Sequence, residues 1–302
     1  MRFIIAGGTG FIGETLCRRL LEAGHSLTIL TRKPVPAAVL SAKKWATWDA
    51  RSPGPWEETL EGADGVVNLA GEPIAARRWT REQKKRIRES RINATRALVN
   101  AIAQRRRKPK LLLNASAVGY YGPRGDEIVT EESGPGNDFL GRVCHEWEQE
   151  ATKAESSGAI VIRLRTGIVL GRDGGALAKM VPPFKFYVGG PLGSGKQWVP
   201  WIHLDDEVGL IQFLLENSGA SGAVNATAPN PVRMKEFSDA LGRVLRRPSW
   251  APVPGFALRL LLGEMADMLL TGQQALPAQA RKRGYGFRYS ALEDALQACI
   301  PI

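Results

Sequence analysis

Short apolar runs alternate with amphipathic stretches through the first half of the chain. Arg2–Ala6 and Ser26–Thr31 are typical of buried strands, and between them Ile12, Leu16 and Leu20 recur at helical spacing. Gly24 follows and is suited to end that helix. The same pattern predicts further strands over 44–48, 65–69, 110–115 and 159–166, and helices over 80–105 and 138–157.

This alternation of strand and helix predicts an α/β fold with a doubly wound parallel sheet of the Rossmann type over residues 1–170. Glycine and proline then crowd residues 171–200, and two amphipathic helices are expected over 235–246 and 256–270. We expect residues 171–198 and 227–302 to form a smaller substrate lobe. Residues 199–226 are expected to rejoin the first domain, with strands over 199–203 and 222–226.

A glycine loop follows the first strand and opens the first helix. Gly7, Gly10 and Gly13 are spaced as in dinucleotide-binding turns. Glycine lets the backbone approach a pyrophosphate, and the free N–H groups of the helix N-terminus favour its negative charge. A plain turn needs fewer glycines, so we expect this loop to bind the cofactor through Gly7, Thr9, Gly10, Phe11, Ile12 and Gly13.

The end of the second strand indicates which dinucleotide binds. An acidic residue there accepts the ribose 2′-OH of NAD, whereas arginine accommodates the 2′-phosphate of NADP. The strand ends Thr31-Arg32-Lys33, and no acidic residue lies between Glu22 and Asp49. We therefore predict NADP(H), with Thr31 and Arg32 near the phosphate, although Arg32 and Lys33 could simply face water.

Composition and charge narrow the classes of function. The formal net charge is +11, but residues 77–91 carry a net charge of +6 and residues 105–108 supply four more basic residues. Such a basic helix is usually a solvated face, so no nucleic-acid partner is expected. Three scattered cysteines favour a reducing compartment, and we expect a cytoplasmic protein. No apolar run is long enough to span a membrane and no Cys/His spacing suits a metal, so neither a membrane nor a metal is expected.

Several motifs together resemble the extended short-chain dehydrogenase/reductase superfamily, the NAD(P)-dependent epimerase/dehydratase group. Besides the glycine loop, these are Asn68–Gly71, Ala115–Gly122 and Trp201–Asp206. The stretches 68–79, 189–203 and 272–277 are similar to an atypical epimerase-like subgroup, sometimes labelled cell-division inhibitors, of unknown substrate. The resemblance implies that Asp49, Leu69, Ala70 and Gly71 line the adenosine part of the cofactor.

The chain departs from the superfamily at the proton relay, which is a Tyr-x-x-x-Lys pair on the helix after the serine segment. At the expected place stand Phe139 and Val143, and none of the five tyrosines has lysine four residues on. Phenylalanine cannot transfer a proton. Ser116 is left as a candidate that orients a carbonyl, or as a serine that only bonds the backbone, and Tyr120 is the nearest alternative acid.

Arg91 interrupts an otherwise apolar helical stripe of Ile87, Ala94, Leu98 and Ile102. An inward-facing arginine needs an anionic partner or an exit to water. In the superfamily this turn lies near the cofactor, so we expect Arg91 to contact a phosphate, with a structural salt bridge as the alternative.

Together these features predict an NADP(H)-dependent oxidoreductase or epimerase that acts on a small molecule held between two lobes, as a monomer or homodimer. The missing proton relay supports a second hypothesis, a non-catalytic regulator or redox sensor that binds NADP(H).

Overall fold

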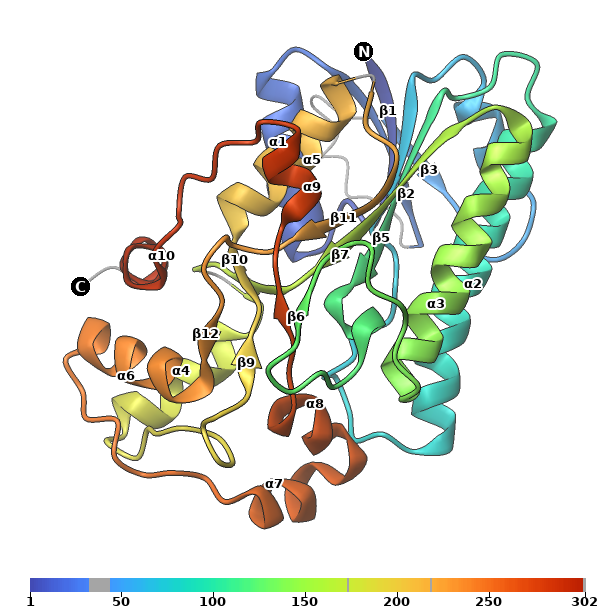
Figure 1. The fold of residues 1–302 in the computed structure, drawn as a ribbon. Helices are drawn as coiled ribbons and strands as arrows, with labels where there is room; N and C mark the ends of the chain where they lie inside the picture. The colour runs from blue at the N-terminus through green and yellow to red at the C-terminus, as the bar shows by residue number, and fades with distance from the viewer. Residues whose placement is uncertain (33–43, 173, 218, 301–302) are drawn as a thin grey trace.

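A sheet of seven parallel strands forms the centre of the molecule (Figure 1), seen in a computed structural model that describes residues 1–32, 44–172, 174–217 and 219–300. The strand order is β11-β7-β5-β4-β1-β2-β3. The strands are β1 (Arg2–Ala6), β2 (Ser26–Thr31), β3 (Lys44–Thr47), β4 (Gly65–Asn68), β5 (Leu111–Ala117), β7 (Ile160–Thr166) and β11 (Gly222–Ala226).

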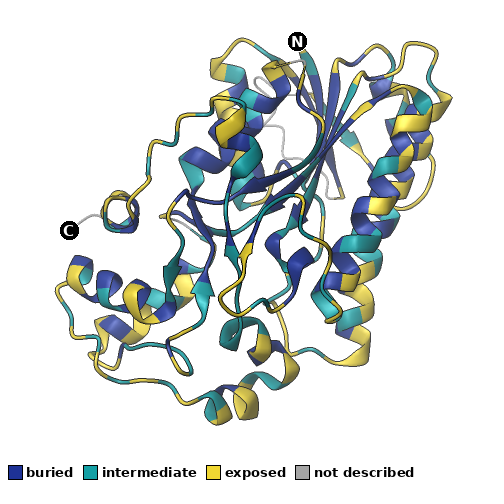
Figure 2. Cartoon of the chain, in the orientation of Figure 1, coloured by how far each residue is buried: buried dark blue, intermediate teal, exposed yellow. Residues whose placement is uncertain are grey.

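Helices cover both faces of this sheet, so successive residues of one strand enter different cores (Figure 2). Phe3 and Ile5 of β1 pack with α1 (Phe11–Glu22) and α5 (Leu204–Glu216), whereas Ile4 and Ala6 pack with α2 (Arg81–Gln104). Helix α3 (Phe139–Thr152) lies beside α2. Burial on both faces explains why these strands read as continuous apolar runs.

The strand order reverses between β1 and β4, because the chain first builds β2 and β3 on one side and then returns to the other. The crossover from β1 to β2 and the later connection from β3 to β4 therefore place their strands on opposite sides of β1. In open α/β sheets a crevice forms at the carboxyl ends of strands at such a point, and ligands bind there.

Two side chains begin the helices on the second face as the sequence predicts. Thr80 accepts a hydrogen bond from the amide of Gln83, and Asp138 accepts one from the amide of Gly141. Helix α3 is shorter than expected, since it ends at Thr152 and continues as the 3₁₀ helix η4 (Lys153–Ser157). Gly158, with φ of +83°, then ends this segment.

The smaller lobe packs around Phe184, Trp201, Phe237, Leu241 and Leu296. Several short strands pair outside the central sheet: β6 with β13, β8 with β10 and β9 with β12. The remaining elements are η2 (Pro55–Leu60), η3 (Val118–Tyr121), β6 (Ile128–Val129), β8 (Ile168–Leu170), α4 (Leu177–Lys185), β9 (Trp198–Val199), β10 (Trp201–His203), β12 (Val232–Arg233), α6 (Met234–Leu245), α7 (Gly255–Leu262), η5 (Gly263–Ala266), α8 (Asp267–Leu270), β13 (Gln274–Ala275), α9 (Ala278–Lys282) and α10 (Leu292–Cys299).

Two expectations for the second half of the chain need correction. The segment 222–226 joins the central sheet beside β7, but the segment 199–203 does not, because β9 pairs with β12 and β10 with β8. The helix expected over 256–270 is broken at Gly263, whose φ of +62° ends α7 before α8 begins.

Four of the seven basic side chains of α2 pair with acidic side chains. Arg88 pairs with Glu146 at 2.5 Å and Arg96 with Glu150 at 3.1 Å, both across to α3. Lys84 pairs with Glu264 of η5. These pairs account for part of the charge that clusters in the sequence and attach α2 to its neighbours.

Among the residues that the structure describes, none of the helices combines the length and the apolar character needed to cross a bilayer. Nor do three or more His, Cys, Asp or Glu side chains of this part of the chain gather where they could hold a metal ion.

Glu207 is a fully buried carboxyl group between α5 and the end of β7. Thr166 donates a hydrogen bond of 2.8 Å to its Oε1, while its Oε2 has no hydrogen-bond partner. Burial raises the pKa of Glu207 to about 8 from its ordinary 4.5. The side chain is therefore protonated in the folded protein at neutral pH.

We predict that Glu207 makes folding stability decrease between about pH 4.5 and pH 8. In this window the folded protein holds a proton that the unfolded chain has released, so stability falls by up to about 1.4 kcal/mol per pH unit. Glu207→Gln should remove this slope, and the exposed Glu58→Gln should not. Urea unfolding from pH 5 to pH 9 provides the measurement, and an unchanged slope in Glu207→Gln would contradict it.

Candidate functional site

The turn between β1 and α1 touches the end of β4 so closely that only glycine fits. Gly7 has φ of +83°, and a Cβ there would lie 2.7 Å from the carbonyl carbon of Leu69. A Cβ on Gly13 would lie 2.2 Å from the carbonyl oxygen of Gly7. These two glycines are thus required by the fold itself.

Gly10 differs, because nothing in the protein requires a glycine there. It precedes the first residue of α1, and a Cβ on it would meet only the carbonyl oxygen of Gly7, at 3.4 Å. The following residues, Phe11 and Ile12, begin the helix and carry amides that lack partners within it. Thr9 beside them is exposed. A bare backbone and free amides suit the approach of a pyrophosphate.

The side chain of Phe11 has a structural role of its own, in addition to the free amide of its backbone. Its ring packs against the loop after β8, where a Cβ on Gly171 or on Gly174 would lie 2.7 Å from ring carbons. The glycines that crowd the sequence here allow this loop to lie directly over the start of α1. Ile12 packs against the main core.

A buried polar cluster fixes the end of β4. Asn68 donates to Thr95 at 3.0 Å and to Asn114 at 2.7 Å, and Trp147 donates to the Thr95 hydroxyl at 2.8 Å. The Asn68 side chain also accepts a hydrogen bond of 3.2 Å from the amide of Ala70. The segment Leu69–Gly71 is therefore held against α2, β5 and α3 by satisfied, buried hydrogen bonds.

Arg91 lies beside this segment, as its place on the α2 stripe predicts. A Cβ on Gly71 would lie 3.3 Å from its guanidinium carbon. The guanidinium donates to the carbonyls of Glu72 and Ile87 at 3.0 and 2.9 Å, and it lies 5.2 Å from the Trp147 ring centroid. Burial lowers the pKa of Arg91. No carboxylate of the described residues forms an ion pair with Arg91, although the charge of Glu72 counteracts the lowering of its pKa. The phosphate contact stays a prediction.

The residues predicted to bind the 2′-phosphate lie at the end of β2, and Asp49, predicted to line the adenosine, follows β3. Thr31 is 8% exposed as the last residue of β2, Arg32 after it is exposed, and Lys33 lies outside the described residues. Asp49 is exposed, and its Oδ1 accepts hydrogen bonds of 2.8 and 2.7 Å from the amides of Arg51 and Ser52. These bonds lower the pKa of Asp49, so it is a carboxylate that shapes its own turn.

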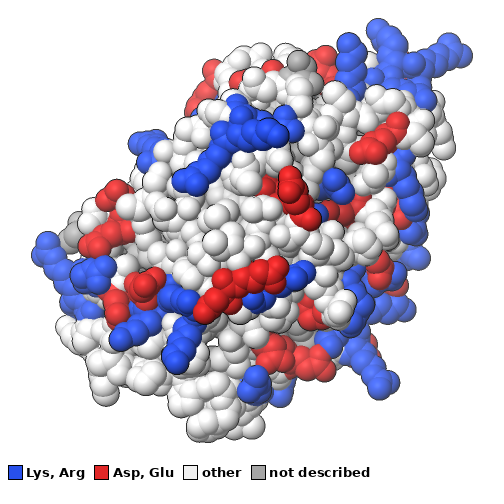
Figure 3. Space-filling view, viewed as in Figure 1, with Lys and Arg blue, Asp and Glu red and all other residues white. Residues whose placement is uncertain are grey.

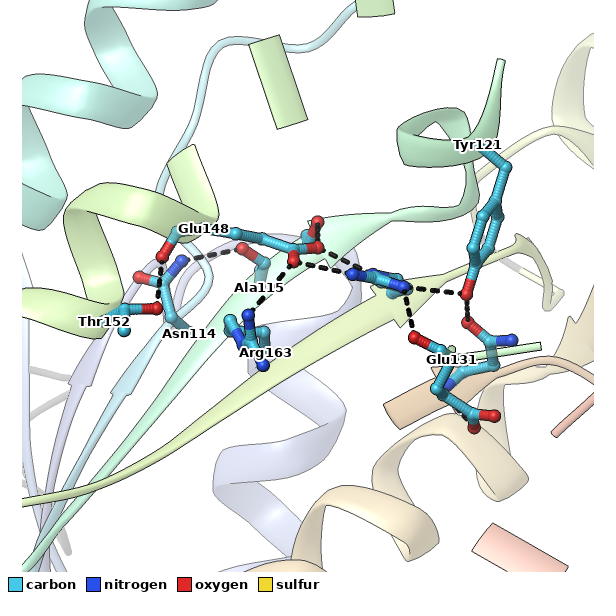
Figure 4. A network of polar contacts seen from close by, with 10 residues as sticks. Asn114, Ala115, Tyr121, Glu131, Glu148, Thr152 and Arg163 are labelled. Atoms are coloured by element: carbon cyan, nitrogen blue, oxygen red, sulfur yellow. Dashed lines mark hydrogen bonds and ion pairs between the residues drawn. The ribbon is translucent and has the colours of Figure 1, made fainter. Parts of the chain in front are cut away.

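Ser116 belongs to a buried charged network that is centred on Glu148. Figure 4 shows this network, with Glu148, Arg163, Tyr121 and Glu131 labelled. Its hydroxyl donates to Glu148 of α3 at 2.7 Å. Arg165 of β7 holds the same carboxylate with two bonds of 2.8 and 2.9 Å. Glu148 is 2% exposed, and a buried carboxylate needs such partners. The reading of Ser116 as a serine that bonds only the backbone is therefore wrong.

Tyr120 stacks on the other side of Arg165, whose guanidinium lies 3.5 Å from the ring centroid. With Glu131, Arg163 and Gln279, it lines a cavity of about 380 Å³ beside β7 and β11. None of the predicted cofactor residues lines this cavity. The network continues through Tyr121, which accepts from Arg165 at 3.0 Å and donates to Asn225 at 2.6 Å.

Phe139 and Val143 have apolar surroundings on α3. The Phe139 ring packs edge-on against Trp79 with centroids 5.2 Å apart, and the Lys84 ammonium lies 5.2 Å from it. Val143 is 3% exposed. Burial also raises the pKa of the neighbouring Cys144 to about 12, so it carries no thiolate.

The segment Trp201–Asp206 has a structural role that its motif alone did not reveal. His203 begins α5 by accepting a hydrogen bond of 3.0 Å from the amide of Asp205. The buried carboxylate of Asp206 accepts from the amides of Arg288 and Tyr289 at 2.8 and 2.9 Å. These bonds attach the C-terminal segment to the first turn of α5.

Comparison with known proteins shows the family to which the chain belongs. A model of the NAD dependent epimerase/dehydratase family matches residues 3–226. The chain belongs to this family. A second model, a domain of unknown function (DUF1731), matches residues 253–299 of this epimerase-family protein.

Relatives match the chain over almost its full length. The chloroplastic "Epimerase family protein SDR39U1 homolog" of Arabidopsis thaliana is 45% identical, and the match covers 99% of this chain and 86% of the length of the relative. "Epimerase family protein YfhF" of Bacillus subtilis is 42% identical over 99% of this chain and 98% of its own. The crystal structure of human epimerase family protein SDR39U1 with NADPH is 36% identical, with a TM-score of 0.89 over 98% of both chains. The predicted superfamily and the Rossmann-type fold are thus confirmed.

We predict that Gly10→Val abolishes dinucleotide binding but leaves the fold intact, because the added side chain fills only the space open to a ligand. Fluorescence titration with NADPH and circular dichroism on the same sample measure both effects. Gly286→Val is a matched control, since a Cβ on Gly286 meets nothing within 4 Å and lies outside the site. Retained binding by Gly10→Val would show that the loop is only a turn.

Proposed function

We propose that this epimerase-family protein binds NADP(H) across the carboxyl ends of β1 and β4. The observation that carries the proposal is the open backbone at Gly10, where the protein leaves room that none of its own side chains uses. The human relative crystallised with NADPH supports the choice of cofactor. Gly10, Phe11 and Ile12 would bind the pyrophosphate, and Arg32 with Thr31 would bind the 2′-phosphate.

The other predicted residues have complementary tasks in this proposal. Leu69, Ala70 and Gly71, held by the Asn68 cluster, would line the adenosine, with Asp49 at its far side. Arg91 lies next to Gly71 and would place its charge near a phosphate. This contact would offset part of the cost of a half-buried arginine whose hydrogen bonds go to backbone carbonyls.

For activity we propose an NADP(H)-dependent oxidoreductase or epimerase that acts on a small molecule. Bound NADP(H) supplies a hydride acceptor or donor. The protein must then orient a carbonyl or hydroxyl and move its proton, a task that Phe139 and Val143 cannot perform. Ser116 and Tyr120 are the candidate groups.

The contacts of Ser116 define what this role would require. A substrate carbonyl needs a donor, and the Ser116 hydroxyl already donates to Glu148. Ser116 would have to turn away from that carboxylate, and a hydrogen bond to a charged group is worth about 1.5–3 kcal/mol. Tyr120 faces a separate cavity and would act only on a ligand that reaches it.

A non-catalytic regulator or redox sensor is the second candidate function. The packing of Phe139 against Trp79 favours it, because the site of the usual tyrosine is an apolar contact. Such a protein would bind NADP(H) tightly and turn over no substrate.

We predict that NADPH binds more tightly than NADH and that Arg32→Asp lowers the affinity for NADPH by about ten- to a hundredfold. This range corresponds to the loss of one charge-assisted hydrogen bond of about 1.5–3 kcal/mol. Calorimetric titration measures both dinucleotides. Arg18→Asp, the same change at an exposed site on α1, is the control. Equal affinities of the wild type for NADPH and NADH would refute the assignment.

We predict that Ser116→Ala lowers the rate of turnover of any substrate found, with little change in NADPH affinity, because its contact is made mainly in the transition state. Hydride exchange with a panel of ketones, enones and nucleotide sugars is the assay, and the exposed Ser156→Ala is the control. Unchanged turnover in Ser116→Ala would exclude Ser116. No wild-type turnover, with tight NADPH binding, would favour the sensor.

A further inference from the structure

Large apolar side chains are exposed together along one margin of the smaller lobe. Seven of the ten large hydrophobic residues that are exposed in the described chain lie in two segments there. We call these seven residues the apolar edge, and each exposes between 54% and 77% of its surface: Phe186, Tyr187, Val188, Trp250, Phe256, Leu260 and Leu261.

The two segments of the apolar edge are adjacent in space. The Trp250 indole donates to the carbonyl of Tyr187 at 2.9 Å, and the amides of Trp250 and Ala251 both donate to that of Gly189 at 3.1 Å. From there the chain runs along the lower margin of the molecule in Figure 1 into α7. The space-filling view shows a largely uncharged surface at this margin (Figure 3).

Helix α7 is apolar around most of its circumference. Leu258 faces the protein and is 7% exposed, whereas Phe256 and Leu260, one turn apart, face outward. A helix with apolar residues on all sides is normally covered on all sides. An exposed patch of this kind on a protein marks a contact with another apolar surface.

The charge of the same segments indicates which kind of partner surface would contact the apolar edge. Residues 177–190 and 243–262 contain six basic residues and no acidic residue. They are Lys179, Lys185, Arg243, Arg246, Arg247 and Arg259. Arg243 and Arg259 pair with Glu293 and Asp267 from other segments, and Arg247 stacks on Tyr187 at 4.7 Å. Lys185 and Arg246, which precede Tyr187 and Trp250 by two and four residues in the sequence, are exposed.

A second copy of the chain fits this surface poorly. A two-fold dimer brings the same patch of both copies together, so Lys185 and Arg246 of each copy would face segments that contain no acidic residue. Anionic lipid satisfies both features at once. Aromatic and aliphatic side chains enter the interfacial region of a bilayer, and lysine and arginine bind its phosphates.

We propose that the apolar edge docks the protein on the surface of a membrane that contains anionic lipid. Helix α7 lies flat in the interface with Phe256, Leu260 and Leu261 inserted, and Trp250 and Tyr187 lie at headgroup level. Lys185 and Arg246 contact lipid phosphates. The lack of a spanning helix in the described residues concerns insertion across a bilayer and leaves contact with its surface open to test.

Flotation with vesicles tests the proposal on the full chain. The wild type should float with vesicles of phosphatidylcholine mixed with phosphatidylglycerol, and should bind pure phosphatidylcholine much less. Phe256→Ser combined with Leu260→Ser should lower binding about tenfold or more, because two large apolar side chains no longer enter the interface. Lys185→Glu combined with Arg246→Glu should lower it by a similar factor.

The control must distinguish an effect of charges at the apolar edge from a general effect of the chain's high net charge. Arg81→Glu combined with Arg86→Glu makes the same change of charge at exposed positions of α2 and should leave binding unchanged. Circular dichroism verifies that each variant is folded. Equal losses in the control and in the Lys185/Arg246 variant would overturn the proposal, as would failure of the wild type to bind mixed vesicles.

Sedimentation velocity without lipid gives the remaining outcome. A dimer that Phe256→Ser with Leu260→Ser converts to a monomer would assign the edge to a second copy and overturn the proposal. An unchanged sedimentation coefficient, together with lost flotation, supports it. Neither result depends on NADPH binding, which can be titrated in the same variants.

Discussion

The close approach of the β1–α1 turn to the end of β4 is the constraint on which the site depends. Gly7 and Gly13 leave no room for a Cβ, so the turn rests directly on Leu69 and on its own backbone. The same contact brings the amides at the start of α1 beside the segment Leu69–Gly71. Asn68 fixes that segment through buried hydrogen bonds to Thr95 of α2 and Asn114 of β5, and Trp147 of α3 bonds the same threonine. The segment is therefore held in place by the protein's own contacts.

Beyond this crevice the protein departs from the chemistry that its family name implies. An apolar contact between Phe139 and Trp79 stands where a proton relay is expected, and Ser116 is bound to Glu148. Glu148 and Arg165 are buried and joined by two hydrogen bonds, and they organise the residues around the end of β5. In the proposed function, a reaction would therefore have to use groups other than Phe139 and Val143.

The strands, the parallel sheet and the glycine loop were predictable, because each has a local signature in apolar runs, helical spacing or glycine spacing. The roles of Ser116, Asp206 and Glu207 were not, since their partners lie on elements distant in sequence. The break at Gly263 and the pairing of β10 with β8 also depend on tertiary packing. Gly10 illustrates the difference: the motif identified it, but only the structure shows that Gly7 and Gly13 serve the fold while Gly10 leaves space for a ligand.

In the proposed function, the space at Gly10 receives the pyrophosphate of NADP(H). A crystal structure of the protein grown with NADPH tests it most directly. We expect the pyrophosphate over Gly10, within hydrogen-bond distance of the amides of Phe11 and Ile12, and the 2′-phosphate beside Arg32. A dinucleotide bound elsewhere, for example in the cavity lined by Tyr120 and Arg163, or a 2′-phosphate directed away from Arg32, would contradict the account.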